Sequence, residues 1–189
     1  MQKQTALYFK NKTEWREWLL VNHSLSKGVY LIFYKVDSRQ ESMRWEEAVQ
    51  EALCFGWIDS TVKKVDDERR KQLFTPRNPK SGWSKVNKNY VKKLTTNNLM
   101  HESGLQKIKI AKKDGSWTSR DNAENLILPD ELKKAFSKNK LAFKNFQAFS
   151  KSYKKNYLHW LYSAKREETK KKRLAQIVNL CEQNIKSRN

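Results

Sequence analysis

Hydrophobic positions at the start of the chain follow first a helical period and then an extended one. Trp15, Trp18 and Leu19 share one helical face, which predicts a helix with Thr13 as its N-cap. The run Val29–Tyr34 is continuously β-branched, aliphatic or aromatic. Such a run predicts a strand buried on both faces. The chain therefore opens with a helix followed by a buried strand.

A second helix and a hairpin come next. Apolar residues from Trp45 to Leu53 recur at helical spacing, and Gly56 can close that helix in the left-handed conformation that glycine adopts cheaply. Residues 57–65 and 69–75 then read as two strands around the acidic turn 66–68. These patterns predict a small sheet covered by helices.

Helical periods dominate the rest of the chain. Ser84 is the expected N-cap of the next helix, and Pro129 suits the first turn of a later one. The spacing predicts helices after Ser84, over 102–113, 130–137 and 141–149, and two longer ones that end the chain. The fold class is therefore α+β, with an N-terminal domain over residues 1–127 and a helical C-terminal module over 128–189.

Composition indicates where the protein is located and which kinds of site it contains. The N-terminus lacks the apolar core of a signal peptide and no stretch approaches 18 uncharged apolar residues, so a cytoplasmic protein without membrane insertion is expected. Cys54 and Cys181 read as reduced thiols rather than a disulfide. His23, His101 and His159 are scattered, so no metal and no cofactor are expected.

Charge is distributed unevenly. The net charge is +20, and residues 80–120 hold 10 basic but only 2 acidic residues. An excess of this kind favours an acidic partner such as nucleic acid, although lysines also commonly decorate solvated helix faces. The candidate nucleic-acid contacts are basic residues on the Ser84 helix and on the last helix: Lys85, Lys88, Lys92, Lys93, Lys170, Lys171, Lys172 and Arg173.

A second candidate site lies between the hairpin and the Ser84 helix. Asp59 sits on a strand and needs a partner, and Arg77 follows a proline that ends the other strand. The two form either a structural ion pair or one side of an anion-binding nest at the helix start. The residues expected to converge there are Trp57, Asp59, Arg77, Ser81, Trp83, Ser84 and Asn87.

Catalytic residue types are poorly placed for a reaction. A serine triad would need a histidine near Ser81 or Ser84, and His101 is the nearest in sequence. Cys54 lies in an apolar run without a basic neighbour, which is typical of a packed thiol. These patterns favour a binding protein over an enzyme.

Longer motifs resemble a known family. The segments 51–59, 74–77 and 83–87, the stretch 111–117, and a tail with Tyr157, Trp160 and residues 164–169 resemble the bacterial YdeI/OmpD-associated, or bacteriocin-protection, family over nearly the whole chain. The resemblance implies a small cytoplasmic bacterial protein linked to bacteriocin protection or envelope stress. It brings no established reaction.

Together these features predict a cytosolic protective or stress-related binding protein. Its expected partner is anionic: nucleic acid along the basic helices, or a phosphorylated small molecule in the pocket between Trp57 and Asn87. Two alternatives remain open. One is an enzyme that acts on a small anionic substrate in that pocket, and the other is an adaptor whose C-terminal aromatic residues dock a protein partner.

Overall fold

The chain divides into two compact units. The computed structural model describes residues 6–188, and its first unit ends at Trp117 while its second begins at Thr118. Residues 1–5 lie outside the described range. They belong to the N-terminal segment whose sequence lacks the apolar core of a signal peptide. The division falls before the expected boundary at residue 127, because the short helix α5 (Asp121–Glu124) packs against a helix of the second unit.

The first unit contains a four-stranded mixed sheet in the order β1-β2-β4-β3. Strand β1 (Ala6–Tyr8) runs parallel to β2 (Val29–Tyr34), and β4 (Arg69–Pro76) runs antiparallel to both β2 and β3 (Trp57–Lys64). The hairpin formed by β3 and β4 is the one that the sequence predicts. Together with the helical second unit, this sheet confirms the α+β class.

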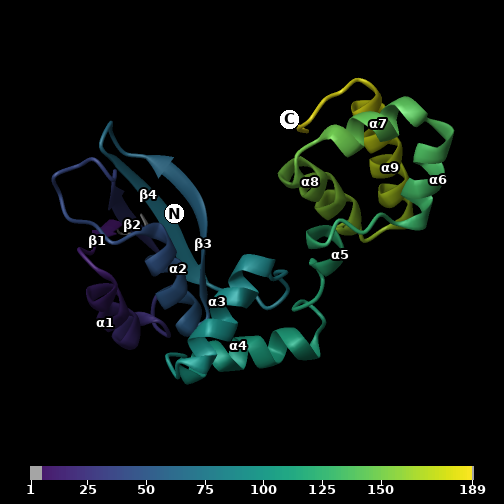
Figure 1. Ribbon diagram of the computed structural model, residues 1–189. Helices are drawn as coiled ribbons and strands as arrows, with labels where there is room; N and C mark the ends of the chain where they lie inside the picture. Colours follow the sequence, from purple (N-terminus) through teal and green to yellow (C-terminus); the bar gives the residue numbers. More distant parts are fainter. Residues whose placement is uncertain (1–5, 189) are drawn as a thin grey trace. The chain divides into compact units, whose positions relative to one another are not determined.

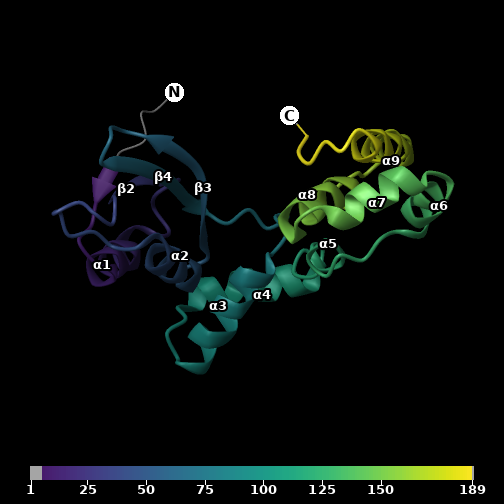
Figure 2. The ribbon, with the colours of Figure 1, turned by 45° about the horizontal axis from the view of Figure 1, so that its top comes forward.

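Helices α1 (Lys12–Asn22) and α2 (Trp45–Cys54) lie on one side of the sheet (Figures 1 and 2). Strand β2 therefore buries Val29, Leu31 and Phe33 but leaves the alternate residues partly exposed. The expectation that β2 is buried on both faces is wrong, because its continuous apolar run includes tyrosines whose rings stay partly accessible on the uncovered face.

The helix starts follow the rules of N-capping, with one change of residue. Asn11, not Thr13, caps α1, and its side chain accepts hydrogen bonds from the amides of Thr13 and Glu14. Ser84 caps α3 (Lys85–Thr96), as predicted, by accepting from the Asn87 amide. Asparagine is at least as good a cap as threonine, so spacing alone does not separate the two positions.

Helix α4 (Glu102–Lys113) has the expected bounds and begins against the end of α2. The His101 amide donates to the Cys54 carbonyl at 3.1 Å, and the Ser103 hydroxyl donates to the Phe55 carbonyl at 3.1 Å. The start of α4 thus satisfies carbonyls that the last turn of α2 leaves without helical partners. These contacts fix where α4 lies beside α3 (Figure 1).

The second unit is helical. After α5 it contains α6 (Asp130–Lys138), α7 (Lys140–Ala148), α8 (Lys151–Tyr162) and α9 (Glu167–Glu182), which are seen together in Figure 2. Their shared core includes Leu132, Phe136, Phe146, Tyr157, Leu161 and Ile177. Within residues 6–188, no helix combines the length and the apolar character needed to cross a membrane.

A basic aromatic groove as the candidate functional site

Arg77 is buried in the loop that leads from β4 to α3. Only 4% of its surface is exposed, and its guanidinium carbon lies 3.7 Å from the centroid of the Trp83 ring. One guanidinium nitrogen donates to the carbonyls of Gly82 at 2.7 Å and Ser81 at 3.4 Å. Stacking and hydrogen bonding together hold this loop in one conformation.

Asp59 has different partners from the one expected. Its carboxylate accepts from the Trp45 indole at 3.1 Å and from the Gln72 amide at 2.5 Å, instead of pairing with Arg77. Trp57 is 1% exposed and donates from its indole to the His23 carbonyl at 3.0 Å. Both residues therefore tie the sheet to the helices that cover it.

The remaining pocket candidates form two local groups. Arg77 is bonded to the Ser81 carbonyl and stacked on Trp83, whereas Ser84 is joined to Asn87 by the helix cap at 3.2 Å. One concave anion site that contains all seven residues therefore stays a prediction. Trp83 also contacts a second aromatic ring, that of Trp117, which lines a neighbouring groove.

That groove runs between α3 and α4 and has a volume of about 510 Å³. We call it the α3–α4 groove. Apolar residues line it together with lysine, asparagine and threonine side chains. Its lining consists of Lys88, Asn89, Val91, Lys92, Thr95, Thr96, Leu105, Ile108, Lys112 and Trp117.

Trp117 is the aromatic centre of the groove. Its ring centroid lies 4.9 Å from that of Trp83, and its backbone amide donates to the Ala111 carbonyl at 2.9 Å. The ammonium groups of Lys88 and Lys112 lie 5.4 and 5.5 Å from the Trp117 ring centroid. A series of contacts therefore connects the buried Arg77 guanidinium with Trp83, Trp117 and two lysines that line the groove.

The charged residues in the lining of the groove are all basic. Lys88, Lys92 and Lys112 line it, and its lining contains no acidic residue. Lys85 and Lys93 are exposed on the same helix but outside the lining. Ammonium groups around a partly exposed indole can bind phosphate groups while the indole stacks on a base.

The basic candidates of α9 have roles within the second unit. Lys170 and Lys172 each form an ion pair with a glutamate of that unit, at 2.6 and 2.9 Å. Arg173 donates to the Trp160 carbonyl at 2.6 Å and lies 5.1 Å from that ring's centroid. Lys171 is exposed. Lys170 and Arg173 therefore link α9 to α6 and α8, whereas the Lys172 pair lies within α9 itself. The α3–α4 groove is consequently the stronger candidate for a nucleic-acid site.

Residues with catalytic potential gather near the end of α2. Cys54 is fully buried, and burial, followed by the nearby Glu51 charge, raises the pKa of its thiol to about 11. Arg16 pairs with Glu51 at 2.7 Å. Burial and the neighbouring His23 lower the pKa of His101. A protonated, buried thiol is a poor nucleophile. Among the described residues, no three histidine, cysteine or acidic side chains form a metal-binding group.

Trp117 and Lys112 are absent from the residues singled out from the sequence. A weak signal existed, since Trp117 closes the stretch Ala111–Trp117 used above for the family resemblance. Their role becomes visible only when α4 lies beside α3, because 29 positions separate Trp117 from Lys88. Sequence spacing across two helices and a connecting turn does not reveal such a contact.

Comparison with known families divides the chain in the same way. Residues 7–107 match the family described as Domain of unknown function (DUF8412). Residues 125–184 match the family described as Bacteriocin-protection, YdeI or OmpD-Associated, which is a narrower range than the motifs suggested. No curated protein and no solved structure matches significantly. The chain thus belongs to the first family, which it matches over more than half of its length, and its residues 125–184 are similar to the bacteriocin-protection, YdeI or OmpD-associated family.

Proposed function

We propose that the first unit binds nucleic acid without strong sequence preference, and single strands above all, through the α3–α4 groove. One observation carries the proposal: Trp117 lies in a groove of about 510 Å³ with the ammonium groups of Lys88 and Lys112 within 5.5 Å of its ring centroid. Three lysines and no acid in the lining suit a phosphate backbone.

Single strands are favoured because their bases can leave the stack and contact an aromatic ring. Base–aromatic stacking contributes about 1–3 kcal/mol per base and tolerates every base. Lysine binds phosphate as a point charge and reads base edges poorly. We therefore expect weak, salt-sensitive binding with little sequence preference.

The other functions considered above receive less support. Cys54 is protonated and buried, which does not favour an enzyme of the nucleophilic type. A phosphorylated small molecule remains a second candidate ligand, because the groove volume falls in the range of small-molecule sites. We also propose that the protein acts in the cytoplasm. The description of the family that residues 125–184 match supports the proposal of a protective role.

The proposal is tested with two fluorescent strands of equal length and charge: a 12-nucleotide oligothymidylate and its abasic counterpart. Fluorescence polarisation at low salt should show tighter binding of the oligothymidylate, because only that strand can stack on Trp117. Trp117→Ala should weaken binding of this strand about 5- to 150-fold, the equivalent of losing one stacked base. Trp117→Phe should restore part of the loss.

Two results would remove the proposal. If the abasic strand binds as tightly as the oligothymidylate, stacking plays no part. If neither strand binds at low salt, the lysines are ordinary solvent-exposed side chains that bind no nucleic acid. Tight binding of a mononucleotide with no gain for the 12-mer would favour the phosphorylated small molecule.

A further inference from the structure

The second unit contains a cavity that its helical core does not fill. Its volume is about 460 Å³, and we call it the α6–α7 cavity. Most of its wall is carbon from leucine and phenylalanine side chains, and two lysines also line it. The lining consists of Leu126, Leu128, Lys133, Phe136, Ser137, Phe143, Phe146, Gln147 and Lys154.

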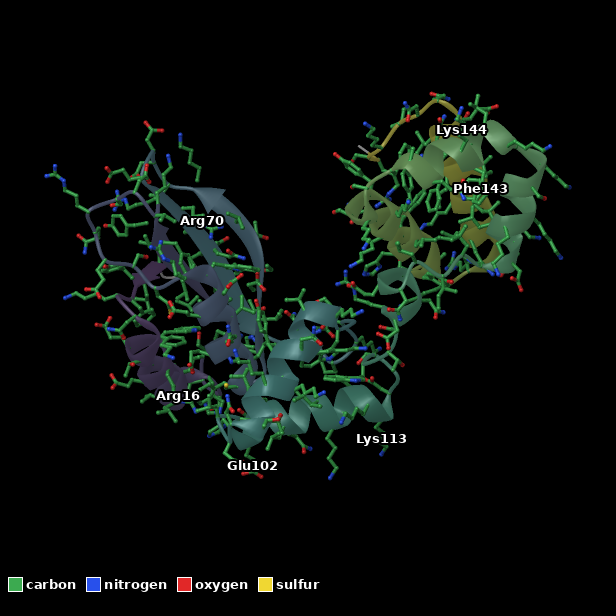
Figure 3. All side chains as sticks on the ribbon, viewed as in Figure 1. Arg16, Arg70, Glu102, Lys113, Phe143 and Lys144 are labelled. Atoms are coloured by element: carbon green, nitrogen blue, oxygen red, sulfur yellow. The ribbon has the colours of Figure 1, made fainter. Side chains whose placement is uncertain are left out.

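Three phenylalanines form one side of the cavity. The ring centroid of Phe136 lies 5.4 Å from that of Phe143 and 5.1 Å from that of Phe146. Phe136 and Phe146 are buried, whereas Phe143, labelled in Figure 3, is 36% exposed. A phenylalanine that lines a cavity and also contacts solvent leaves apolar surface for a ligand to cover.

Leu126 lies on another part of the wall in an unusual backbone conformation. Its φ is 57°, in the left-handed region that residues with a side chain rarely adopt. The position follows α5, and its amide donates to the Ala123 carbonyl at 3.1 Å, a helix end at which glycine is the usual residue. The leucine side chain lines the cavity, which a glycine could not do.

The charges at the cavity all have one sign. The Lys154 ammonium donates to the Gln147 carbonyl at 2.6 Å, and across residues 6–188 no carboxylate pairs with it. Lys133 forms an exposed ion pair with Asp130, a residue outside the lining. With two ammonium groups and no acid, the lining complements an anion attached to an apolar body.

We infer that the α6–α7 cavity binds one small amphipathic anion, an alkyl chain that ends in a carboxylate, as in a medium-chain fatty acid. The chain would lie against Phe136, Phe143 and Leu126, and the carboxylate would bind the Lys154 ammonium. This site lies in the other unit and does not depend on the proposed nucleic-acid function.

The size of the cavity favours such a ligand over a protein segment. Small-molecule sites typically enclose about 300–1,000 Å³ and are mostly apolar, with a few polar groups that orient the ligand. A docked helix would instead need a long groove with anchors spaced over two turns. At about 460 Å³ the cavity belongs to the first class.

Calorimetry with the full chain and sodium decanoate tests the inference. We expect saturable binding of one decanoate per chain, with decanol and butyrate binding at least about fivefold more weakly, since each lacks one of the two features that the cavity recognises. Decylammonium should bind at least about fivefold more weakly than decanoate, because its charged end would lie beside the Lys154 ammonium.

Three variants distinguish binding in the cavity from attraction to the overall positive charge of the protein. Ser137→Phe fills the cavity from an exposed helix position and should abolish decanoate binding. Lys154→Ala should weaken decanoate about three- to fivefold and leave decanol unchanged. Lys151→Ala, an exposed lysine on the same helix outside the lining, is the matched control and should change neither.

The inference is overturned if several decanoate molecules bind per chain, or if Lys151→Ala weakens binding as much as Lys154→Ala does. Either result would show attraction to the overall charge. If Ser137→Phe does not fold, judged by its circular dichroism, the comparison of the two lysine variants decides alone.

Discussion

Gly104 lies where α4 passes closest to α2, and its replacement by alanine tests how the groove is positioned. A Cβ atom built on Gly104 would lie 2.1 Å from the Cys54 carbonyl oxygen and 2.9 Å from the Leu53 carbonyl oxygen. Both obstacles are backbone atoms, so no side-chain rotation relieves them. Helix α4 would have to move by about 1 Å to reach ordinary contact distances.

The expected cost follows from what that movement breaks. The His101 and Ser103 hydrogen bonds to the end of α2 contribute about 1 kcal/mol each, and overpacking adds about 1–3 kcal/mol. Alanine recovers up to about 1 kcal/mol through its helix propensity. Gly104→Ala should therefore lower the free energy of unfolding of the first unit by about 3 kcal/mol.

Gly115→Ala is the matched control. Gly115 has φ 79° and no atom within 4 Å of a built Cβ, so alanine there should cost only about 1–2 kcal/mol of backbone strain. Urea unfolding followed by tryptophan fluorescence is the assay, because six of the seven tryptophans precede Thr118 and report the first unit. An equal or smaller loss for Gly104→Ala than for Gly115→Ala would refute the close packing of α4 on α2.

Two further predictions concern buried groups. Burial raises the pKa of the Cys54 thiol to about 11 and that of the Cys181 thiol to about 12, from an ordinary value near 9. The folded chain therefore holds these two protons at a pH at which the unfolded chain has lost them. The free energy of unfolding should consequently be unaffected by the two thiols below about pH 9 and should fall between about pH 9 and 12. Replacing both cysteines with alanine should flatten this alkaline decline in urea titrations, and an unchanged slope would contradict it. Arg77→Lys removes the planar stack on Trp83 and should lower the free energy of unfolding by about 1–3 kcal/mol, measured by thermal unfolding. An unchanged melting temperature would show that the loop keeps its conformation without this stack.

Much of the fold follows from the sequence because local signals agree with the tertiary structure. The bounds of α4 and the Ser84 cap match their predictions, since periodicity and capping chemistry act within a few residues. Strand β1 has only three residues and exists through its pairing with β2. Helix α5 has four residues, too few for a periodic signal.

The candidate site was less predictable because its contacts depend on how elements face one another. Two-residue spacing puts Asp59 on a strand face, but only the position of α2 and the register with β4 select Trp45 and Gln72 as its partners. Lysine positions on α3 could be read from the sequence. That Lys88 and Lys112 lie around Trp117 depends on the approach of α4 to α3.

The salt dependence of single-strand binding tests the α3–α4 groove most directly. For single strands, the slope of log affinity against log salt changes by about 0.7 for each phosphate neutralised. The variant Lys88→Ala/Lys112→Ala should lower the magnitude of that slope by about 1.4 for a 12-nucleotide oligothymidylate. The control Lys12→Ala/Lys27→Ala removes the same charge from exposed positions outside the groove and should leave the slope nearly unchanged. Equal slope changes for the two double variants would show that the binding follows net charge alone, and would contradict a nucleic-acid site in the groove.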